Sequence, residues 1–156
     1  MNVVMTGATG GVGSAVAELF ASKGHNLILL GRNEKKLSEL SELICKNYNI
    51  TVDFFKCDAD NLVDVKRVVK GINKLSKKIG LLINIAGVFP YGPISEESES
   101  NFDNCINVNL KLPYLLSLGL FKSLKKDGGG KIINIGSSSS YGGFKNTVTY
   151  CASKHA

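Results

Sequence analysis

The chain has 156 residues, enough for one domain with a buried core and too few for two. Its 44% hydrophobic and 21% charged content is typical of a folded globular protein, and no apolar run is long enough to cross a bilayer. The net charge of +6 comes from 19 basic residues spread along the chain, whereas nucleic-acid surfaces cluster such residues and favour Arg. We therefore predict one domain, residues 1–156, that binds neither nucleic acid nor membrane.

No secretory signal precedes the first apolar run, which begins almost at Met1, so we expect a cytoplasmic protein. The four cysteines share no C-x-x-C spacing and lie far apart in the sequence: Cys45, Cys57, Cys105 and Cys151. This pattern favours reduced, mostly buried thiols over a disulfide framework or a metal site.

Short apolar runs alternate with helical patterns along the chain. The expected strands are Val3–Met5, Leu27–Leu30, Val52–Phe55, Leu81–Ile83 and Ile132–Ile135. The expected helices are Gly11–Lys23, Glu34–Asn47, Asn61–Lys78 and Ser98–Lys126. Nearly continuous apolar runs are typical of strands buried on both faces, and this alternation predicts a doubly wound parallel α/β sheet of the Rossmann type. Any ligand crevice then lies at the carboxyl ends of the strands.

A glycine-rich segment joins the first expected strand to the first helix. It reads Thr6-Gly7-Ala8-Thr9-Gly10-Gly11-Val12-Gly13. Glycines allow a tight turn and close approach of backbone to a pyrophosphate, and the following helix N-terminus offers free N–H groups to the phosphates. A tight turn without any ligand is the alternative, but four glycines in seven residues are more than such a turn needs. We predict a dinucleotide site here.

The end of the second strand bears on the choice of dinucleotide. An acidic residue about 20 positions beyond the glycines usually binds the ribose 2′-OH of NAD, yet Gly31 stands there and Arg32 follows it. A guanidinium at this place binds a 2′-phosphate, so Arg32 favours NADP, although it could also simply cap a surface turn. After the third strand, Asp58 is placed either to accept from an adenine amino group or to cap the next helix.

Two asparagines stand out in the second half of the chain. Asn84 ends the fourth strand beside the small residues Ala86 and Gly87, which suggests backbone packed close to a flat group, and the loop Val88–Ser95 then could line a substrate mouth. Asn109 interrupts the apolar face of the long helix. A buried amide is costly unless its hydrogen bonds are met, so Asn109 either bonds backbone or holds an active-site water.

Hydroxyl groups follow the last expected strand. Ser137 begins a run of four serines at the sheet edge that also carries the glycine turn, and Tyr150 and Lys154 follow at a spacing that places both on one helix face. A neighbouring ammonium favours the phenolate form of a tyrosine, which suits acid/base chemistry. The tyrosine–lysine spacing alone is a weak signal and gains value from the serines before it.

Taken in order, these residues resemble the short-chain dehydrogenase/reductase family. Thr6-Gly7-x-x-x-Gly11-x-Gly13 matches its cofactor motif, and Asn84-Ile85-Ala86-Gly87 is similar to its N-N-A-G motif with Ile at the second position. Ser137 precedes Tyr150 by the family's usual 13 residues. Gly80 and Gly136 depart from the family pattern, which often has Asp and Ser there. The resemblance extends over the whole chain.

The resemblance implies a role for each matching residue. Tyr150 exchanges a proton with the substrate oxygen, Lys154 supports Tyr150 and holds the nicotinamide ribose, and Ser137 hydrogen-bonds the carbonyl or alcohol. Asn109 holds a water in a proton relay. The implied cofactor contacts are Thr6, Gly7, Gly11, Val12, Gly13, Arg32, Asp58, Asn84, Ala86, Gly87, Tyr150 and Lys154. We thus expect an NADP-preferring oxidoreductase acting on a small carbonyl/alcohol pair, with no metal.

Two other functions remain open. The glycine spacing also fits NAD(P)-dependent epimerases and dehydratases of the extended branch, and a non-catalytic dinucleotide-binding module is the second alternative. The sequence stops two residues after Lys154, whereas family members continue through further strands. We expect an N-terminal portion of a homo-oligomeric enzyme, truncated after the fifth strand and inactive by itself, because a helix stub of about one turn frays.

Overall fold

The computed structural model describes residues 1–75 and 77–156. The strands are β1 Asn2–Thr6, β2 Asn26–Gly31, β3 Val52–Lys56, β4 Ile79–Asn84 and β5 Lys131–Asn134. The main helices are α1 Gly11–Ser22, α2 Glu34–Asn47, α3 Leu62–Lys74, α4 Glu99–Ile106, α5 Leu112–Lys125 and α6 Val148–His155. All five expected strands are present, and α1 and α2 lie within one residue of their expected bounds.

The strands form one parallel sheet in the order β3-β2-β1-β4-β5, as expected for a Rossmann-type fold. β1 pairs with β2 on one side and β4 on the other, so the order reverses next to β1. At the carboxyl edge Thr6 lies opposite Leu30 and Asn84, and Asn84 lies opposite Asn134. The glycine turn follows β1 directly at this switch point, which is where open α/β sheets bind their ligands.

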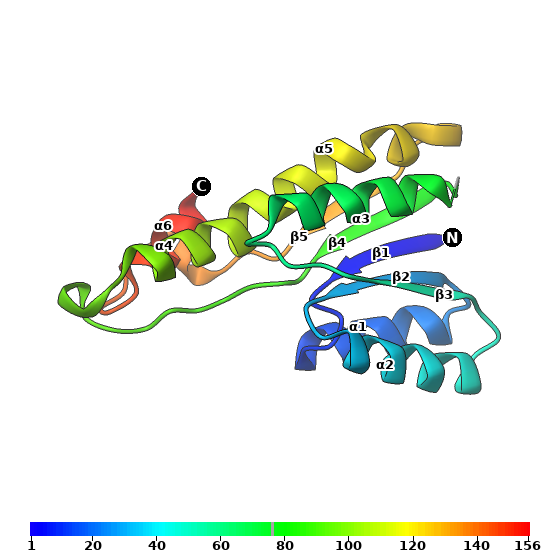
Figure 1. Cartoon of the computed structure of the whole chain (residues 1–156), viewed down its shortest axis with the longest axis horizontal. Helices are drawn as coiled ribbons and strands as arrows, with labels where there is room; N and C mark the ends of the chain where they lie inside the picture. Colours follow the sequence, from blue (N-terminus) through cyan, green and yellow to red (C-terminus); the bar gives the residue numbers. More distant parts are fainter. Residues whose placement is uncertain (76) are drawn as a thin grey trace.

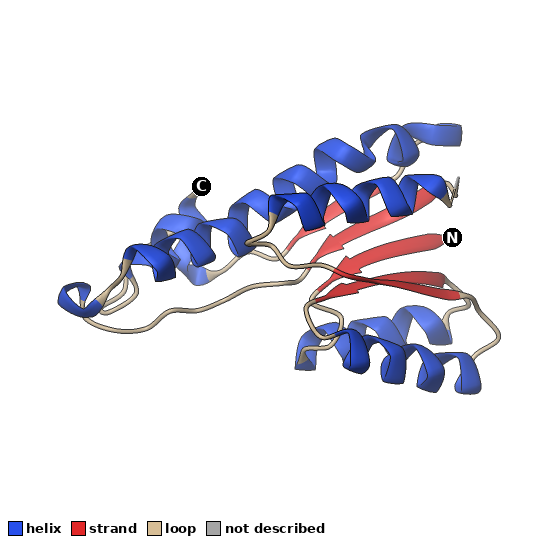
Figure 2. Ribbon diagram, viewed as in Figure 1, coloured by secondary structure: helices blue, strands red, loops and turns tan. Residues whose placement is uncertain are grey.

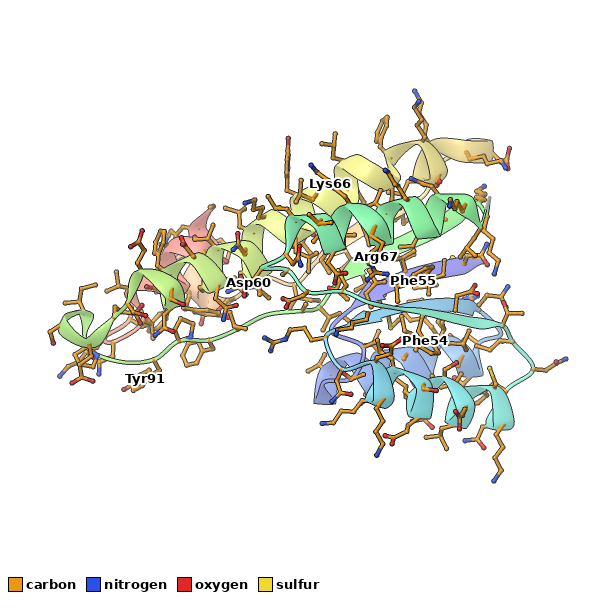
Figure 3. The ribbon with its side chains drawn as sticks, viewed as in Figure 1. Phe54, Phe55, Asp60, Lys66, Arg67 and Tyr91 are labelled. Carbon is orange, nitrogen blue, oxygen red and sulfur yellow. The ribbon has the colours of Figure 1, made fainter. Side chains whose placement is uncertain are left out.

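Helices cover both faces of the sheet. Helices α1 and α2 lie on one face, and α3 and α5 lie on the other (Figures 1 and 2). The side chains of β3 show the resulting alternation, because Phe54 packs on the α1/α2 core and Phe55 on the α3/α5 core (Figure 3). The central strands β1, β2 and β4 are buried on both faces, which explains their continuous apolar sequences.

The long helix expected over Ser98–Lys126 is two α-helices joined by a π-helical turn, Asn107–Lys111. The turn adds a residue to the helix and rotates the buried face of α5 relative to that of α4. Phe102 in α4 is 46% exposed. The buried row of this region is Cys105, Val108, Leu112, Leu116, Leu120 and Leu124.

Helix α3 is shorter than the expected Asn61–Lys78. Asn61 is its N-cap, with the side-chain oxygen accepting from the N–H groups of Val63 and Asp64, and the helix ends at Lys74. Ile79 is the first residue of β4. Ser76, within the expected helix, lies outside the described residues.

β5 differs from the other strands in burial. All four of its residues are exposed, with Ile132 at 42% and Ile133 at 44%, because β5 is at the edge of the sheet and no helix of the described chain covers it fully.

Within the described ranges, no helix has the length and hydropathy that crossing a bilayer requires.

Candidate dinucleotide and active site

Two glycines of the turn are required by the protein's own backbone. Gly7 has φ +67°, and a Cβ there would lie 2.8 Å from the backbone nitrogen of Ala86. A Cβ on Gly13 would lie 2.0 Å from the carbonyl oxygen of Gly7. Gly11 differs, because a Cβ on it meets nothing within 4 Å, so no contact inside the protein explains this glycine. The open space at Gly11 fits a ligand approaching the backbone.

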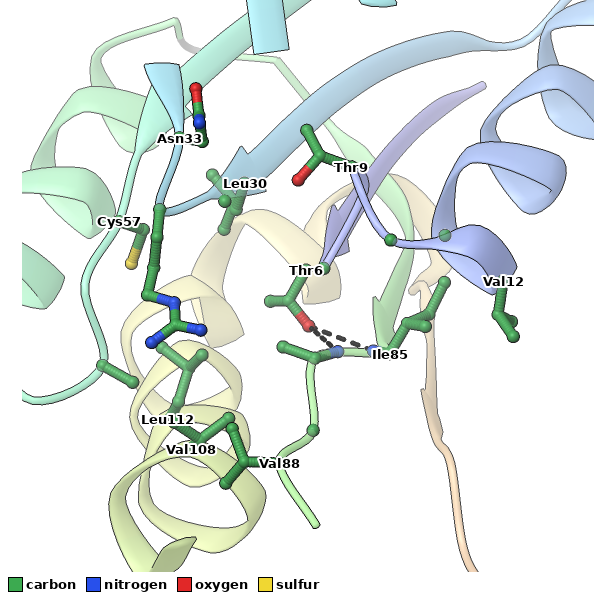
Figure 4. A pocket seen from close by; sticks show the side chains of 18 of the residues that line it. Thr6, Thr9, Val12, Leu30, Asn33, Cys57, Ile85, Val88, Val108 and Leu112 are labelled. Carbon is green, nitrogen blue, oxygen red and sulfur yellow. Dashed lines mark hydrogen bonds between the residues drawn. The ribbon is translucent and has the colours of Figure 1, made fainter. Parts of the chain in front are cut away.

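Thr6 holds this turn against the end of β4. Its Oγ1 accepts hydrogen bonds of 3.0 Å from the N–H groups of both Ile85 and Ala86 (Figure 4). These bonds link the carboxyl ends of β1 and β4, which are neighbouring strands, at the switch point. Thr6 therefore shapes the site through the backbone that follows β4.

A cavity of about 470 Å³ opens beside the turn (Figure 4). Of the expected cofactor residues, those that line it are Thr6, Gly7, Gly11, Val12, Gly13, Arg32, Ala86 and Gly87. Helix α1 starts at its rim, and its N-cap Gly10 makes no side-chain cap bond. The cavity thus combines free helix N–H groups with a glycine cradle, which fits the pyrophosphate of a dinucleotide.

The part of the cavity formed by the end of β2 and the start of α2 carries positive charge. Arg32 and Lys36 both line it, and Lys36 sits in the first turn of α2, where the Lys36 N–H donates to the Asn33 side chain. Lys36 was missed by our sequence interpretation, although its spacing of four residues from Arg32 at the start of a helix was a usable signal. Two cations on one wall suit an anionic group such as a 2′-phosphate.

Asp58 has no place in this lining, although its neighbours Cys57 and Ala59 do. Its carboxylate accepts from the Asp60 N–H, while its own N–H donates to Asp64, as in a loop that leads into a helix.

Burial, with a smaller effect of the Asp64 charge, raises the pKa of the Cys57 thiol from 9.0 to about 11. Cys57 is therefore a neutral thiol at physiological pH.

Asn109 bonds backbone, the first of the two roles we considered. Its Oδ1 accepts from the Val88 N–H at 2.9 Å, and its Nδ2 donates to the Val88 carbonyl at 3.0 Å. Nδ2 also lies 2.9 Å from Ser153 Oγ and 3.3 Å from Cys105 Sγ. The amide ties the loop after β4 to α6, so the loop and the helix that carries Tyr150 are held together.

Tyr150 and Lys154 share one face of α6, as their spacing predicted. Lys154 Nζ lies 5.9 Å from the centre of the Tyr150 ring and donates to the Ile135 carbonyl at 2.9 Å. Phe89 packs edge-on against the Tyr150 ring, with ring centres 4.6 Å apart. Ser137 Oγ accepts from the Ser139 N–H, and within residues 1–75 and 77–156 its hydroxyl proton has no acceptor.

Asn84 lies outside the first cavity, in contrast to the other residues of its motif. It is 3% exposed, and its Nδ2 donates to Asn134 Oδ1 at 2.7 Å across the β4–β5 pair. Both asparagines border a second cavity of about 430 Å³ together with Asn109, Ser140 and Lys154. Asn134 was missed by our sequence interpretation, and the polar residue inside the run Ile132–Ile135 was the available signal.

Comparison with known proteins identifies the family. A family model described as short chain dehydrogenase matches residues 1–156. The chain belongs to the short-chain dehydrogenase family. Similar proteins include an uncharacterized oxidoreductase of Thermotoga maritima, 35% identical over 99% of this chain and 60% of its own length. A 3-oxoacyl-[acyl-carrier-protein] reductase of Rickettsia conorii is 34% identical over 97% of this chain and 59% of its own length.

Solved short-chain dehydrogenase structures agree with the fold. One from Sphingobium yanoikuyae in complex with NADPH superposes with a TM-score of 0.91 at 27% identity, covering 99% of this chain and 60% of its own. The bulky-bulky ketone specific alcohol dehydrogenase of Comamonas testosteroni has a TM-score of 0.91 at 27% identity, covering 99% of this chain and 61% of its own. The chain thus spans about 60% of the length of the relatives it matches.

Proposed function

We propose that the protein is an NADP(H)-dependent oxidoreductase that interconverts a carbonyl and an alcohol, with Tyr150 as the acid/base. Two adjacent residues carry this proposal: Val88 lines the glycine-turn cavity, and Phe89 packs on the ring of Tyr150. The cavity that would hold a dinucleotide therefore adjoins the loop that contacts the tyrosine. The NADPH complex of a related structure supports the same cofactor.

Each expected residue has a chemical task in this proposal. The bound cofactor supplies or accepts the hydride at the carbonyl carbon. Tyr150 gives its proton to the carbonyl oxygen during reduction and takes it back during oxidation, and Lys154, whose Nζ lies 5.9 Å from the centre of the Tyr150 ring, would hold the nicotinamide ribose. The free hydroxyl proton of Ser137 hydrogen-bonds the same substrate oxygen. Asn109 positions these groups through Val88 and Ser153.

Two finer expectations belong to the same proposal. Arg32 and Lys36 on the cavity wall favour NADP over NAD, and Asp58 remains a predicted adenine contact. We also propose that the protein is cytoplasmic and forms a homo-oligomer. Light scattering of the complete protein tests the oligomeric state directly. A monomer at micromolar concentration would contradict the oligomer without affecting the proposed chemistry.

The decisive test is Tyr150→Phe in the complete protein, assayed with NADPH and a panel of ketones. Removing the hydroxyl should lower turnover by roughly 10²–10⁴-fold with NADPH binding little changed. Tyr141→Phe is the matched control, because Tyr141 is a 93% exposed tyrosine of the preceding loop. Near-normal turnover in Tyr150→Phe refutes the assignment. Dinucleotide binding without turnover of any ketone favours a binding module, and turnover of a nucleotide sugar alone favours an epimerase or dehydratase.

A further inference from the structure

An exposed pair of aromatic rings continues from Tyr150 along the loop after β4. The Phe89 ring packs edge-on against Tyr150, and the Tyr91 ring stacks on Phe89 with centres 6.2 Å apart. Phe89 is 58% exposed and Tyr91 is 68% exposed, and neither belongs to a core cluster. Figure 3 shows Tyr91 projecting from this loop, away from the sheet. Packing among the described residues therefore does not explain why these two positions are aromatic.

The loop that carries the pair is fixed at both ends. Asn109 binds both backbone groups of Val88, and the Gly92 N–H donates to the Asn146 carbonyl at 3.0 Å. The second bond ties the loop to the segment that leads into α6. Because the loop is anchored on both sides of Phe89, the aromatic pair keeps its position relative to Tyr150. A preorganised surface of this kind binds a ligand without an ordering cost.

Charge next to the pair is negative. Residues 85–98 contain no Lys or Arg but include Glu96 and Glu97. These two glutamates border a cavity of about 410 Å³ together with Phe89 and Tyr91, and the polar lining is completed by Asn101 and Asn104. Glu97 also accepts from the Thr149 hydroxyl at 2.7 Å. The cations on neighbouring segments are Lys145 and Lys154, of which Lys154 is bonded to the Ile135 carbonyl.

We propose that Phe89 and Tyr91 form a substrate subsite that takes a flat, uncharged aromatic group attached to the reacting carbon. Aromatic rings prefer edge-to-face or offset partners with centres 4.5–7 Å apart, and this pair offers such a surface beside the ring of the tyrosine that transfers the proton. The glutamates disfavour a carboxylate or phosphate at the same place. The inference rests on the proposed function and narrows it to aryl ketones and the corresponding alcohols. The ketone gains a hydride from NADPH and a proton from Tyr150, which yields the alcohol and NADP⁺.

Three ketones test the subsite in the complete protein with NADPH. Acetophenone carries the flat ring, cyclohexyl methyl ketone has similar size without flatness, and 4-acetylbenzoate adds a carboxylate. We expect kcat/KM to be highest for acetophenone. The measured quantity is the ratio of kcat/KM with acetophenone to kcat/KM with cyclohexyl methyl ketone. Phe89→Leu should lower this ratio by about 3- to 10-fold, which is the factor expected from the loss of one aromatic pair.

Matched variants separate this effect from a general loss of activity. Phe89→Tyr should keep the ratio, and Tyr91→Leu should lower it less than Phe89→Leu because Tyr91 is further from Tyr150. Phe121→Leu on α5, with 57% exposure close to that of Phe89, should leave the ratio unchanged. An unchanged ratio in Phe89→Leu, or a preference for 4-acetylbenzoate, overturns the subsite and leaves the proposed function intact. Failure to reduce any ketone overturns the proposed function itself.

Discussion

The glycine turn after β1 and the catalytic segment from β5 to α6 meet at the same edge of the sheet but are fixed by different interactions. In the turn, Gly7 and Gly13 leave no room for a Cβ, and the Thr6 side chain accepts from two N–H groups at the end of the next strand. The catalytic segment is joined to the rest by the β4–β5 pairing and the backbone bond from Gly92 to Asn146, and the side chains of Asn109 and Phe89 add contacts to α6, while β5 itself is exposed. The cofactor half thus depends on two glycines with no space for a side chain, while the catalytic half depends on contacts between segments that lie far apart in the sequence.

The largest expected effect compares two glycines of one turn. Gly13→Ala places a Cβ 2.0 Å from the Gly7 carbonyl oxygen, so we expect a loss of more than about 4 kcal/mol of folding stability. Gly11→Ala meets no protein atom within 4 Å and should change stability by less than about 1 kcal/mol while abolishing NADPH binding. Urea unfolding and isothermal titration measure the two quantities. Equal losses of stability would show that the turn is more adaptable than its backbone geometry indicates.

A second pair of substitutions compares burial in the two regions. Leu82 in β4 is 0% exposed, so Leu82→Ala should cost about 2–5 kcal/mol of folding stability. Ile133 in β5 is 44% exposed, so Ile133→Ala should cost about 1 kcal/mol. Thermal or urea unfolding of both variants gives the comparison. A cost at Ile133 that matches the cost at Leu82 would show that β5 is covered in solution.

Charge reversal on the cavity wall tests whether the cofactor half sets the choice of dinucleotide. Arg32→Asp replaces a phosphate partner with a repelling carboxylate, so the preference should shift toward NAD by about 2–4 kcal/mol. Dissociation constants for NADPH and NADH, measured for both proteins, report this shift. Tighter binding of NADH by the unmodified protein would contradict the preference for NADP.

The smallest expected effect is a pH dependence in the cofactor half. The pKa of Cys57 is raised from 9.0 to about 11 in the folded protein, so above pH 9 the unfolded chain loses the thiol proton first. Folding stability should therefore fall between pH 9 and 11. Cys57→Ala should flatten this decline, and Cys45→Ala, which removes an exposed thiol, is the matched control. A decline of the same slope in Cys57→Ala would assign it to other groups.

Local patterns in the sequence were sufficient to predict the sheet and the glycine turn. Continuous apolar runs identified each central strand, and the position of Gly7–Gly13 between a strand and a helix identified the turn. The expectation that Tyr150 and Lys154 share a helix face also needed only their spacing.

Features that depend on contacts between distant segments were not predictable in the same way. Asn109 lies in the π-helical turn and bonds Val88, 21 residues earlier in the chain, and no local signal specifies Val88 as the partner. The Asn84–Asn134 pair depends on the register of β4 against β5. The exposure of β5 likewise reflects what lies beside it, whereas its sequence resembles that of the buried strands.

The π-helical turn Asn107–Lys111 has a consequence for how this chain can vary in evolution. It separates two helices with different neighbours, since α4 packs against α6 and α5 packs against α3. Deleting one residue from the turn would restore a regular helix and rotate α5 by about 100° relative to α4. The row from Leu112 to Leu124 would then leave the core. Natural insertions and deletions should therefore be absent from this segment and collect in loops such as 126–130.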